Sequence, residues 1–348
     1  MQKSATISSI ANELNITPAT VSRALQDHPS ISHSTKQSVL KVASRLNYKR
    51  NRVASSLRSG KTHMIGVIIP GADTNFFGSV VHGIEKCANA KGYNVLLYQS
   101  NETQEHEIKG IETFLAAQVD GILVSVAKDT NNYAYYEELK KKKIPVVFFD
   151  RADDDTGISS VVTDDYKGAF IATEHLIKNG YNHIAHVSGP QHLKVFCDRK
   201  KGYEDALKQY NLPLTDGFIY EGNVSIESGK AATRHFLSLK QKPDAVFAAE
   251  DFTALGVMKE LKSHNIKIPE AFGVFGFANE LFGEHITPTL STIDPQAVTM
   301  GKESFELLLQ MIENKNEAVV EKKIVLNPIP VFRESSQRKI SGHLNVYS

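Results

Sequence analysis

Residues 6–25 read TISSIANELNITPATVSRAL, and this stretch decides the fold of the N-terminal region. Apolar residues in its first half repeat at the i, i+3, i+4 and i+7 spacing of one buried helix face. They are Ile7, Ile10, Ala11 and Leu14. Asn15 follows, and asparagine tolerates the left-handed conformation that ends a helix. The stretch therefore predicts a short amphipathic helix that stops near residue 15.

A second helix is predicted directly after this break. Thr17 can cap it, and Pro18 suits its first position, where a missing N–H costs nothing. A third helix is predicted to begin near Ser32 and to bury one face at the same spacing. The inner positions are Val21, Ala24 and Leu25 in the second helix and Val39, Val42, Ala43 and Leu46 in the third. Three short helices, the first two joined by a tight turn, are typical of a helix-turn-helix unit.

The outer face of the second helix is suited to reading base pairs. Small side chains let a helix approach the major groove, where Arg23 can bond guanine O6 and N7 and Gln26 can pair with adenine. The helix starts and nearby polar side chains are candidates to hold phosphates. The predicted base-reading residues are Pro18, Ala19, Ser22, Arg23 and Gln26, and the predicted backbone contacts are Thr6, Thr17, Thr20, Ser32, Thr35, Tyr48 and Asn51. The alternative is a three-helix bundle with a merely solvated face.

Charge is distributed unevenly along the 348 residues. Residues 1–62 carry ten Lys or Arg against two acids, whereas the remainder carries 30 basic and 37 acidic residues. A basic head on a mildly acidic body predicts a polyanionic partner for the head alone. A solvated basic surface is the alternative.

The segment after Tyr48 reads KRNRVASSLRSGKT over residues 49–62. Val53, Ala54 and Leu57 share one helical face, but a helix of about seven residues is shorter than the roughly 12–15 needed for independent stability. We therefore expect it to order only against a partner, such as its copy in a dimer with DNA beneath.

The run TISSIANELNITPATVSRAL, followed by LNYKRNRVASSLRSGKTHMIGVIIP, resembles the headpiece and hinge of the lactose repressor family. In that family the hinge helices of two subunits pair in the minor groove, and each inserts a leucine between base pairs. The resemblance implies that Leu57 is this wedge, with Ala54 beside it in the hinge, and that the operator is kinked there. Packing of Leu57 on the body is the alternative.

The body, from residue 62 to about 340, alternates short apolar runs with helical patterns. This alternation predicts parallel, doubly wound α/β sheets with helices on both faces. The pattern restarts after residues 150–160, so we expect two lobes of similar design, with a ligand in the crevice at the strand ends. The expected strands are Ile65–Ile69, Asn94–Tyr98, Gly121–Val124, Pro145–Phe149, Ile184–Val187, Ala245–Ala248 and Gly273–Phe277. The expected helices are Val80–Ala90, Glu105–Ala117, Tyr133–Lys142, Tyr166–Asn179, Lys200–Tyr210, Ser228–Leu239 and Thr253–Ser263.

The resemblance covers the body too, because the family's sensor region is similar to periplasmic sugar-binding proteins. It implies three crossings between lobes, near residues 160, 292 and 326, and a helix over 296–313 that returns to the first lobe. The implied division is a headpiece (1–49), a hinge (50–62), an N-terminal lobe (63–162 with 293–326), a C-terminal lobe (163–292 with 327–338) and a tail (339–348).

Candidate effector-binding residues lie just beyond strands or at positions that match the family's pocket. Asn75 and Phe76 follow the first strand, and an aromatic ring there can stack on a sugar or base. Asp164 can accept hydrogen bonds from two hydroxyls. Asn279 follows the strand expected at Gly273–Phe277, and the resemblance adds Arg199, Glu250 and Asp251. The alternatives are that Asp164 and Asp251 only cap helices and that Arg199 only pairs with a helix acid.

The sequence indicates a binding protein rather than an enzyme. It has no Walker loop, no GxSxG elbow and no HExxH, and its histidines and two cysteines (Cys87 and Cys197) fit no metal spacing, so neither metal nor cofactor is predicted. Many members of the family it resembles carry an aspartate where this chain has Ala278, and purine-sensing members carry an arginine aligned with Leu193, so a purine effector is not expected. The resemblance implies a sugar or sugar phosphate, the family's usual effector. No signal peptide or 18-residue apolar run is present, so we expect a cytoplasmic protein with no membrane partner.

These observations together predict a ligand-responsive, sequence-specific repressor. It would bind a pseudo-palindromic DNA operator as a homodimer, under control of a small molecule in the inter-lobe cleft. One alternative is a solute-binding module without gene regulation, which leaves the basic head unused. A nonspecific architectural DNA binder is another, but it would not need a ligand-type body.

Overall fold

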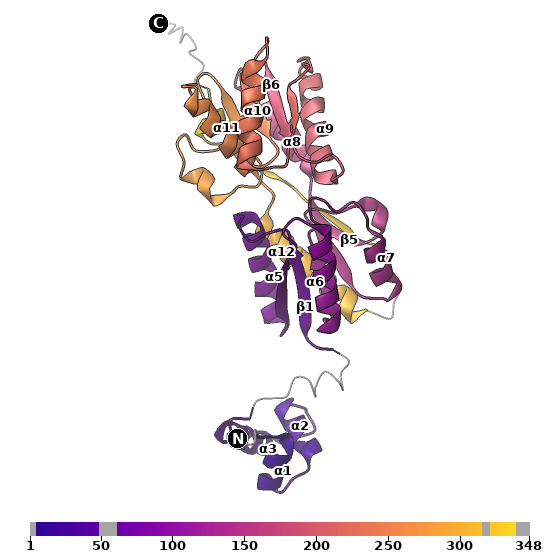
Figure 1. Ribbon diagram of the computed structural model, residues 1–348. Helices are drawn as coiled ribbons and strands as arrows, with labels where there is room; N and C mark the ends of the chain where they lie inside the picture. The colour runs from indigo at the N-terminus through magenta and orange to yellow at the C-terminus, as the bar shows by residue number, and fades with distance from the viewer. Residues whose placement is uncertain (1–4, 49–60, 315–320, 339–348) are drawn as a thin grey trace. The chain divides into compact units, whose positions relative to one another are not determined.

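The computed structural model describes residues 5–48, 61–314 and 321–338 and divides into two compact units, Met1–Thr62 and His63–Ser348 (Figure 1). We call the first the headpiece and the second the body, and each is described by itself. The hinge residues Asn51, Ala54 and Leu57 and the tail 339–348 lie outside the described residues.

The headpiece consists of three short helices, α1 (Ile7–Leu14), α2 (Pro18–Leu25) and α3 (His33–Arg45). Thr17 caps α2 as predicted, and α3 begins at the predicted Ser32. The hydroxyls of Thr6, Thr17 and Ser32 each accept a backbone N–H group of the first turn. Asn15 ends α1 in the left-handed conformation, with φ of 53°. The predicted inner faces meet in one core of Ile10, Ala11, Val21, Ala24, Val39, Val42 and Ala43. The helix-turn-helix prediction is confirmed.

The first lobe of the body is built on a six-stranded sheet in which all neighbouring strands are parallel. The strand order is β11-β5-β4-β3-β1-β2. The strands are β1 (Met64–Ile69), β2 (Asn94–Gln99), β3 (Gly121–Val124), β4 (Val146–Phe149), β5 (Ser159–Thr163) and β11 (Lys323–Leu326). Helices α5 (Asn75–Ala90) and α12 (Ala297–Glu313) pack on one face, and α6 (Gln104–Ala116) and α7 (Ala134–Lys141) pack on the other.

Strand β1 shows why this sheet needs helices on both sides. Ile65, Val67 and Ile69 pack into the core with α5 and α12, whereas Ile68 packs into the core with α6 and α7. Gly66 lies under α6, where an added Cβ would come within 2.2 Å of the Phe114 ring. A strand buried on both faces reads as the continuous apolar run that the sequence shows.

The second lobe repeats this design around a parallel four-stranded sheet of order β7-β6-β8-β9. Its strands are β6 (Ile184–Ser188), β7 (Ile219–Glu221), β8 (Ala245–Ala248) and β9 (Gly273–Phe275). Helices α8 (Asp165–Lys178) and α9 (Lys194–Gln209) cover one face, and α10 (Ile226–Ser238) and α11 (Asp251–Ser263) cover the other. The predicted α/β class with parallel sheets is confirmed.

The chain passes between the two sheets at three places. It leaves β5 for α8, returns from β10 (Thr292–Asp294) into α12, and leaves β11 for β12 (Ile329–Val331). β10 and β12 pair antiparallel as a two-stranded ribbon, with Thr292 opposite Val331. Three short 3-10 helices, Asp154–Thr156, Leu281–Glu284 and Glu334–Ser336, complete the described elements.

Several predicted boundaries in the body are wrong. The segment 159–163, expected to lie in a crossing, is the buried strand β5 of the first sheet, and β7 was not predicted. Polar Ser159 and Ser160 interrupt the apolar pattern, although both are buried and the Ser159 hydroxyl accepts the Lys322 N–H at 3.1 Å. Helices α5 and α9 begin five and six residues earlier than expected, because neither has a side-chain cap of its own to signal its start.

Candidate functional site

Helix α2 presents the predicted base-reading face to solvent. Val21 and Ala24 are buried in the headpiece core, which fixes the rotation of the helix. Pro18, Ala19, Arg23 and Gln26 are exposed, and Ser22 is half-buried. The helix therefore offers two long polar side chains among small ones.

The guanidinium of Arg23 is available for a base. The two headpiece acids are held elsewhere, because Glu13 pairs with Arg45 and the Asp27 carboxylate lies 2.7 Å from Lys36 Nζ. Within residues 5–48, no ion pair or hydrogen bond occupies the Arg23 side chain. An unpaired arginine on a helix face is the group that binds guanine through two hydrogen bonds.

The predicted phosphate contacts cluster at helix starts. The Thr17 hydroxyl accepts the Thr20 N–H at 3.1 Å, and the Ser32 hydroxyl accepts the Thr35 N–H at 3.2 Å. Thr6 and Ser9 form a reciprocal capping box. Tyr48 is half-buried against the headpiece core. Capped helix N-termini carry partial positive charge that favours phosphate groups.

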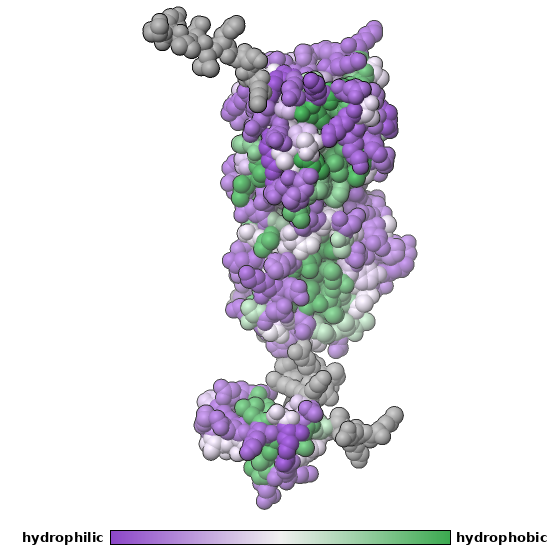
Figure 2. All heavy atoms as spheres, turned by 90° about the vertical axis from the view of Figure 1, so that its left-hand side faces the viewer, coloured by the Kyte–Doolittle hydropathy of each residue, from purple (hydrophilic) through white to green (hydrophobic). Residues whose placement is uncertain are grey.

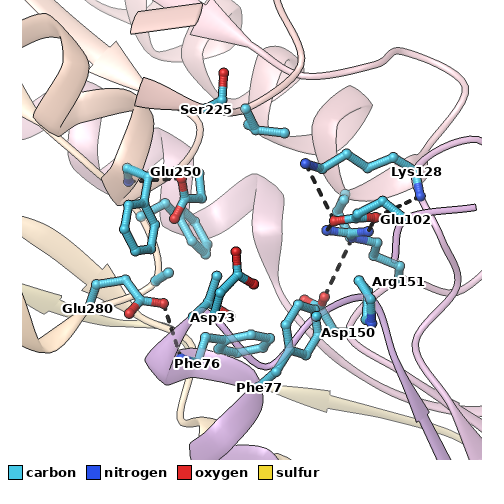
Figure 3. A pocket seen from close by; sticks show the side chains of 18 of the residues that line it. Asp73, Phe76, Phe77, Glu102, Lys128, Asp150, Arg151, Ser225, Glu250 and Glu280 are labelled. Atoms are coloured by element: carbon cyan, nitrogen blue, oxygen red, sulfur yellow. Dashed lines mark hydrogen bonds and ion pairs between the residues drawn. The ribbon is translucent and has the colours of Figure 1, made fainter. Parts of the chain in front are cut away.

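The body contains a cavity of about 720 Å³ lined by residues of both lobes (Figure 3). Strand ends and helix starts supply its walls, as expected for parallel sheets. Its aromatic residues are Phe76, Phe77, Phe196, Phe252 and Phe277. Its charged residues are Asp73, Glu102, Lys128, Asp150, Arg151, Arg199, Glu250 and Glu280. Such a mixture of apolar walls and a few polar groups is typical of a small-molecule site.

One end of the cavity combines cations with a carboxylate. Arg151 donates from both terminal nitrogens to Glu102, at 2.7 and 3.2 Å, and Lys128 Nζ lies 3.4 Å from the same carboxylate. Burial would raise the pKa of Glu102, but Arg151 and Lys128 outweigh burial and lower it. Asp150 is half-buried beside Arg151, and burial raises the pKa of its carboxyl. The cations at this end are already neutralised.

Arg199 lies inside α9 and is held by a buried partner. Its Nε and one terminal nitrogen each lie 2.7 Å from Asp165 Oδ1, and its other terminal nitrogen donates to the Ala249 carbonyl at 2.6 Å. The guanidinium lies 3.7 Å from the centre of the Phe277 ring. Burial raises the pKa of Asp165 to about 7, against the opposing effect of Arg199. The ion pair with Asp165 therefore holds the Arg199 guanidinium in place at the cavity wall.

The opposite end of the cavity is acidic. Figure 3 shows Glu250 and Glu280 on that side, with Asp73 toward the middle of the cavity. Glu280 accepts the backbone N–H groups of Asn75 and Phe76, at 2.8 and 3.1 Å, and so caps α5 of the first lobe from the second. Glu250 caps α11, accepting the Phe252 N–H at 2.8 Å. Burial, with Asp251 and Glu280 nearby, raises the pKa of Glu250 to about 8.

Three of the predicted effector residues, Phe76, Arg199 and Glu250, line this cavity. The other four are not among the lining residues. The Asn75 N–H is bonded to Glu280, and Asn279 bonds to Arg333 and Asp294. Asp164 accepts the Lys167 N–H at 2.9 Å and lines a smaller cavity of about 170 Å³, which lies beside the first.

Asp251 is fully buried and supports a residue that lines the cavity instead of lining it itself. It accepts the Glu280 N–H and the Thr292 hydroxyl, both at 2.8 Å, and so positions Glu280. The Cys197 thiol donates to the Gln191 carbonyl at 2.7 Å, and burial raises its pKa, which makes it a weak nucleophile.

Sequence reasoning missed six charged residues of the cavity: Asp73, Glu102, Lys128, Asp150, Arg151 and Glu280. Five of them follow the strands β1, β2, β3 and β4 within a few residues. The rule that ligands bind beyond strand ends could have found those five. Glu280 lies three residues beyond the strand expected at Gly273–Phe277, so the same rule points to it, but its contact with α5 of the first lobe had no local signal.

None of the described helices is long and apolar enough to cross a membrane. No group of three or more metal-binding side chains occurs in the described parts of the chain.

Two family models together span nearly the whole chain. Residues 6–51 match bacterial regulatory proteins of the lacI family, and residues 62–334 match periplasmic binding proteins and the sugar binding domain of the LacI family. The chain belongs to the LacI family. Its members are transcription regulators rather than enzymes, so this LacI-family protein is a ligand-responsive, DNA-binding regulator of transcription.

Relatives and solved structures agree with this assignment. Catabolite control protein A of Priestia megaterium is 34% identical over 95% of this chain and 99% of its own. The probable HTH-type transcriptional repressor ExuR of Bacillus subtilis is 32% identical over 91% and 95%. The structure of CcpA from Lactococcus lactis has a TM-score of 0.72 at 29% identity and covers 78% of this chain and 98% of its own. A lac repressor dimer bound to operator shares the fold, with a TM-score of 0.84 at 24% identity over 96% and 99%.

Proposed function

We propose that this LacI-family regulator binds a pseudo-palindromic operator as a homodimer, and that a small unphosphorylated sugar or polyol in the cavity sets its affinity for that operator. The observation that carries the proposal is the cavity itself, which is lined by both lobes and combines aromatic rings with hydrogen-bonding carboxylates and arginines. A ligand that contacts both lobes can bias their relative arrangement, which is the physical requirement for coupling.

The chemistry of the walls favours hydroxyl groups over a phosphate. About 720 Å³ suits a mono- or disaccharide-sized molecule, and aromatic faces stack on sugar rings. The cations that line the cavity already pair with carboxylates: Arg151 and Lys128 with Glu102, and Arg199 with Asp165. A phosphate would have to displace these partners, whereas hydroxyls can donate to the carboxylates without doing so.

The small size of one headpiece supports a dimer. A single recognition helix contacts few base pairs, and two of them double the interface over half-sites about one helical turn apart. Figure 2 shows apolar side chains at the surface of the body in both lobes, and Leu281 is 58% exposed. Exposed apolar surface of this kind is a feature of association sites.

The remaining assignments are part of the same proposal. Residues 50–62 form the hinge, where Asn51, Ala54 and Leu57 contact the operator. The lobes comprise residues 63–162 with 293–326 and residues 163–292 with 327–338. Ligand-dependent rearrangement of the lobes then changes hinge pairing, and a coupling of about 1–3 kcal/mol would change operator affinity about 5–150-fold.

Fluorescence anisotropy with operator fragments across a salt series tests the DNA-binding part. We expect affinity to fall steeply with salt, because bound phosphates release counterions, and random DNA to bind far more weakly. Deletion of residues 1–60 should abolish binding while a thermal-shift response to the effector persists. Equal affinity for operator and random DNA would contradict the proposal, and sedimentation equilibrium checks the dimer.

A thermal-shift screen of sugars beside their phosphates tests the effector class. A ligand present at 100 times its dissociation constant stabilises the folded protein by about 2.7 kcal/mol. We expect unphosphorylated compounds to raise the melting temperature. A response confined to the phosphates would show that the paired cations are available to anions after all.

A further inference from the structure

We propose that the effector carries a positively charged amino group, which binds at the acidic end of the cavity formed by Asp73, Glu250 and Glu280. The inference rests on the proposed function, since it concerns the ligand of that same cavity, and it goes further by assigning the ligand's charge. An amino sugar or an amine-bearing polyol has the required chemistry.

The charges that line the cavity do not balance at this end. Asp73 has no hydrogen bond or ion pair within the described parts of the chain, and it is close enough to Glu280 to disfavour ionisation of that carboxyl. Glu250 and Glu280 accept hydrogen bonds only from backbone N–H groups, so neither carboxyl has an ion pair with a cationic side chain in the described parts of the chain. Each carboxylate retains lone pairs that can accept further hydrogen bonds.

The positive charges lie at the other end and are already committed. Figure 3 places Lys128 and Arg151 with Glu102 on the side opposite Glu250 and Glu280. Arg199 is satisfied by Asp165 and by the Ala249 carbonyl. An incoming ammonium group would offset the charges of Asp73 and Glu280 and would favour loss of the proton that burial keeps on Glu250 near neutral pH.

The neighbouring rings add to the preference for a cation. Phe76 and Phe252 line the cavity, and their backbone N–H groups donate to Glu280 and Glu250 respectively. Aromatic faces attract ammonium groups, and the attraction grows when water is excluded. Carboxylates combined with aromatic rings thus favour an ammonium over a neutral hydroxyl at this end, while the Glu102 end remains suited to hydroxyls.

The first experiment identifies the charge of the effector without knowing its structure. A small-molecule extract of the cells that encode the protein is separated at neutral pH into fractions retained by a cation exchanger, retained by an anion exchanger, or retained by neither. Each fraction is added to the full-length protein, and operator affinity and melting temperature are measured. We expect the active fraction to be the one retained by the cation exchanger.

Chemical acetylation then tests whether the charge is an amine. Acetic anhydride in mild aqueous base converts primary and secondary amines to uncharged amides, so treatment of the active fraction should abolish its effect. Activity found in the neutral or anionic fraction, or surviving acetylation, would overturn the proposal while leaving a ligand-controlled regulator intact. A complete extract without any effect would count against both this proposal and the proposed function.

A pair of charge-matched variants locates the amine. Asp73→Asn removes a carboxylate that holds nothing in place, and we expect the active fraction to bind at least about tenfold more weakly, since hydrogen bonds to charged groups are the strong ones. Asp216→Asn removes the same charge from an exposed turn of the second lobe and should bind like the unmodified protein. Equal affinity of both variants for the active fraction would show that the acidic end does not bind it.

Discussion

The contacts that stabilise the headpiece join residues close together in the sequence, whereas contacts that shape the cavity of the body join residues far apart in it. In the headpiece, the cap that starts α2 joins Thr17 to Thr20, three residues apart. In the body, the cap that starts α5 joins Asn75 to Glu280, which are 205 residues apart. The first kind of contact can be recognised from residue types in a window, whereas the second exists only once two lobes have folded. Changes in the two regions should therefore have separable effects.

The largest effect is expected from Arg199→Ala. This change leaves Asp165 buried without its cation, and breaking a buried pair costs about 3–5 kcal/mol. The free energy of unfolding of the body, measured by urea denaturation and circular dichroism, should fall accordingly.

Lys201→Ala is the matched control for this loss. Lys201 lies on the same helix and pairs with Asp205 at 3.0 Å, but its side chain is 65% exposed. Surface pairs contribute about 0–1 kcal/mol, so its removal should scarcely matter. Equal losses from the two variants would show that Arg199 does not stabilise the body through burial.

The pH dependence of stability should distinguish the body from the headpiece. Burial raises the pKa of Glu250 to about 8 and that of Asp251 to about 7. Between pH 6.5 and 8 the folded body therefore retains protons that the unfolded chain has lost. The free energy of unfolding of the body should fall as pH rises through this window, by up to about 1.4 kcal/mol per pH unit for each retained proton.

Between pH 6.5 and 8, the contribution of these carboxyls to the pH dependence of stability can be separated from that of the buried histidines. Burial lowers the pKa of both His175 and His186 to about 4, so their contribution changes only below about 6.5 and is constant above it. Glu250→Gln should reduce the slope, which urea denaturation at a series of pH values measures. In the headpiece, Lys36 lowers the pKa of Asp27, so no such slope is expected there. A stability of the body that rises between pH 6.5 and 8 would refute this account.

These differences explain how far the sequence alone could lead. The three headpiece helices and their caps were predictable, because Thr17, Pro18 and Ser32 act on their immediate neighbours. The alternation of strands and helices in the body was predictable for a similar reason. Glu280 was not, because its role depends on Asp251 holding its backbone from another element and on α5 lacking a cap of its own. Asp164 matched a strand-end pattern but only caps α8 at the edge of a smaller cavity.

An intermediate effect on DNA binding is expected from Arg23→Ala. Removing a base-contacting arginine should weaken operator binding by about 1–3 kcal/mol and relax sequence preference at one position of each half-site. Anisotropy measurements with single-base operator variants would show this.

Lys41→Ala supplies the control for charge, because Lys41 is exposed on α3 and lies outside the predicted base-reading face. Its loss should weaken binding to operator and to random DNA by a similar factor, as expected for a contact with phosphate. If Arg23→Ala also weakened binding to both kinds of DNA equally, the Arg23 guanidinium would contact phosphate, and α2 would not read bases through it.

The smallest effect is expected from Thr17→Ala, which removes the cap of α2. Loss of a threonine cap costs about 1 kcal/mol, so local opening of α2 should become roughly fivefold more frequent. Hydrogen exchange of the full-length protein, followed by mass spectrometry on peptides covering Pro18–Leu25, measures this directly. Thr17→Ser keeps the accepting hydroxyl and should exchange like the unmodified protein. Since the cap spans three residues, exchange in the body should be unaffected, and faster exchange there would show that the headpiece is not the locally stabilised unit that its sequence indicates.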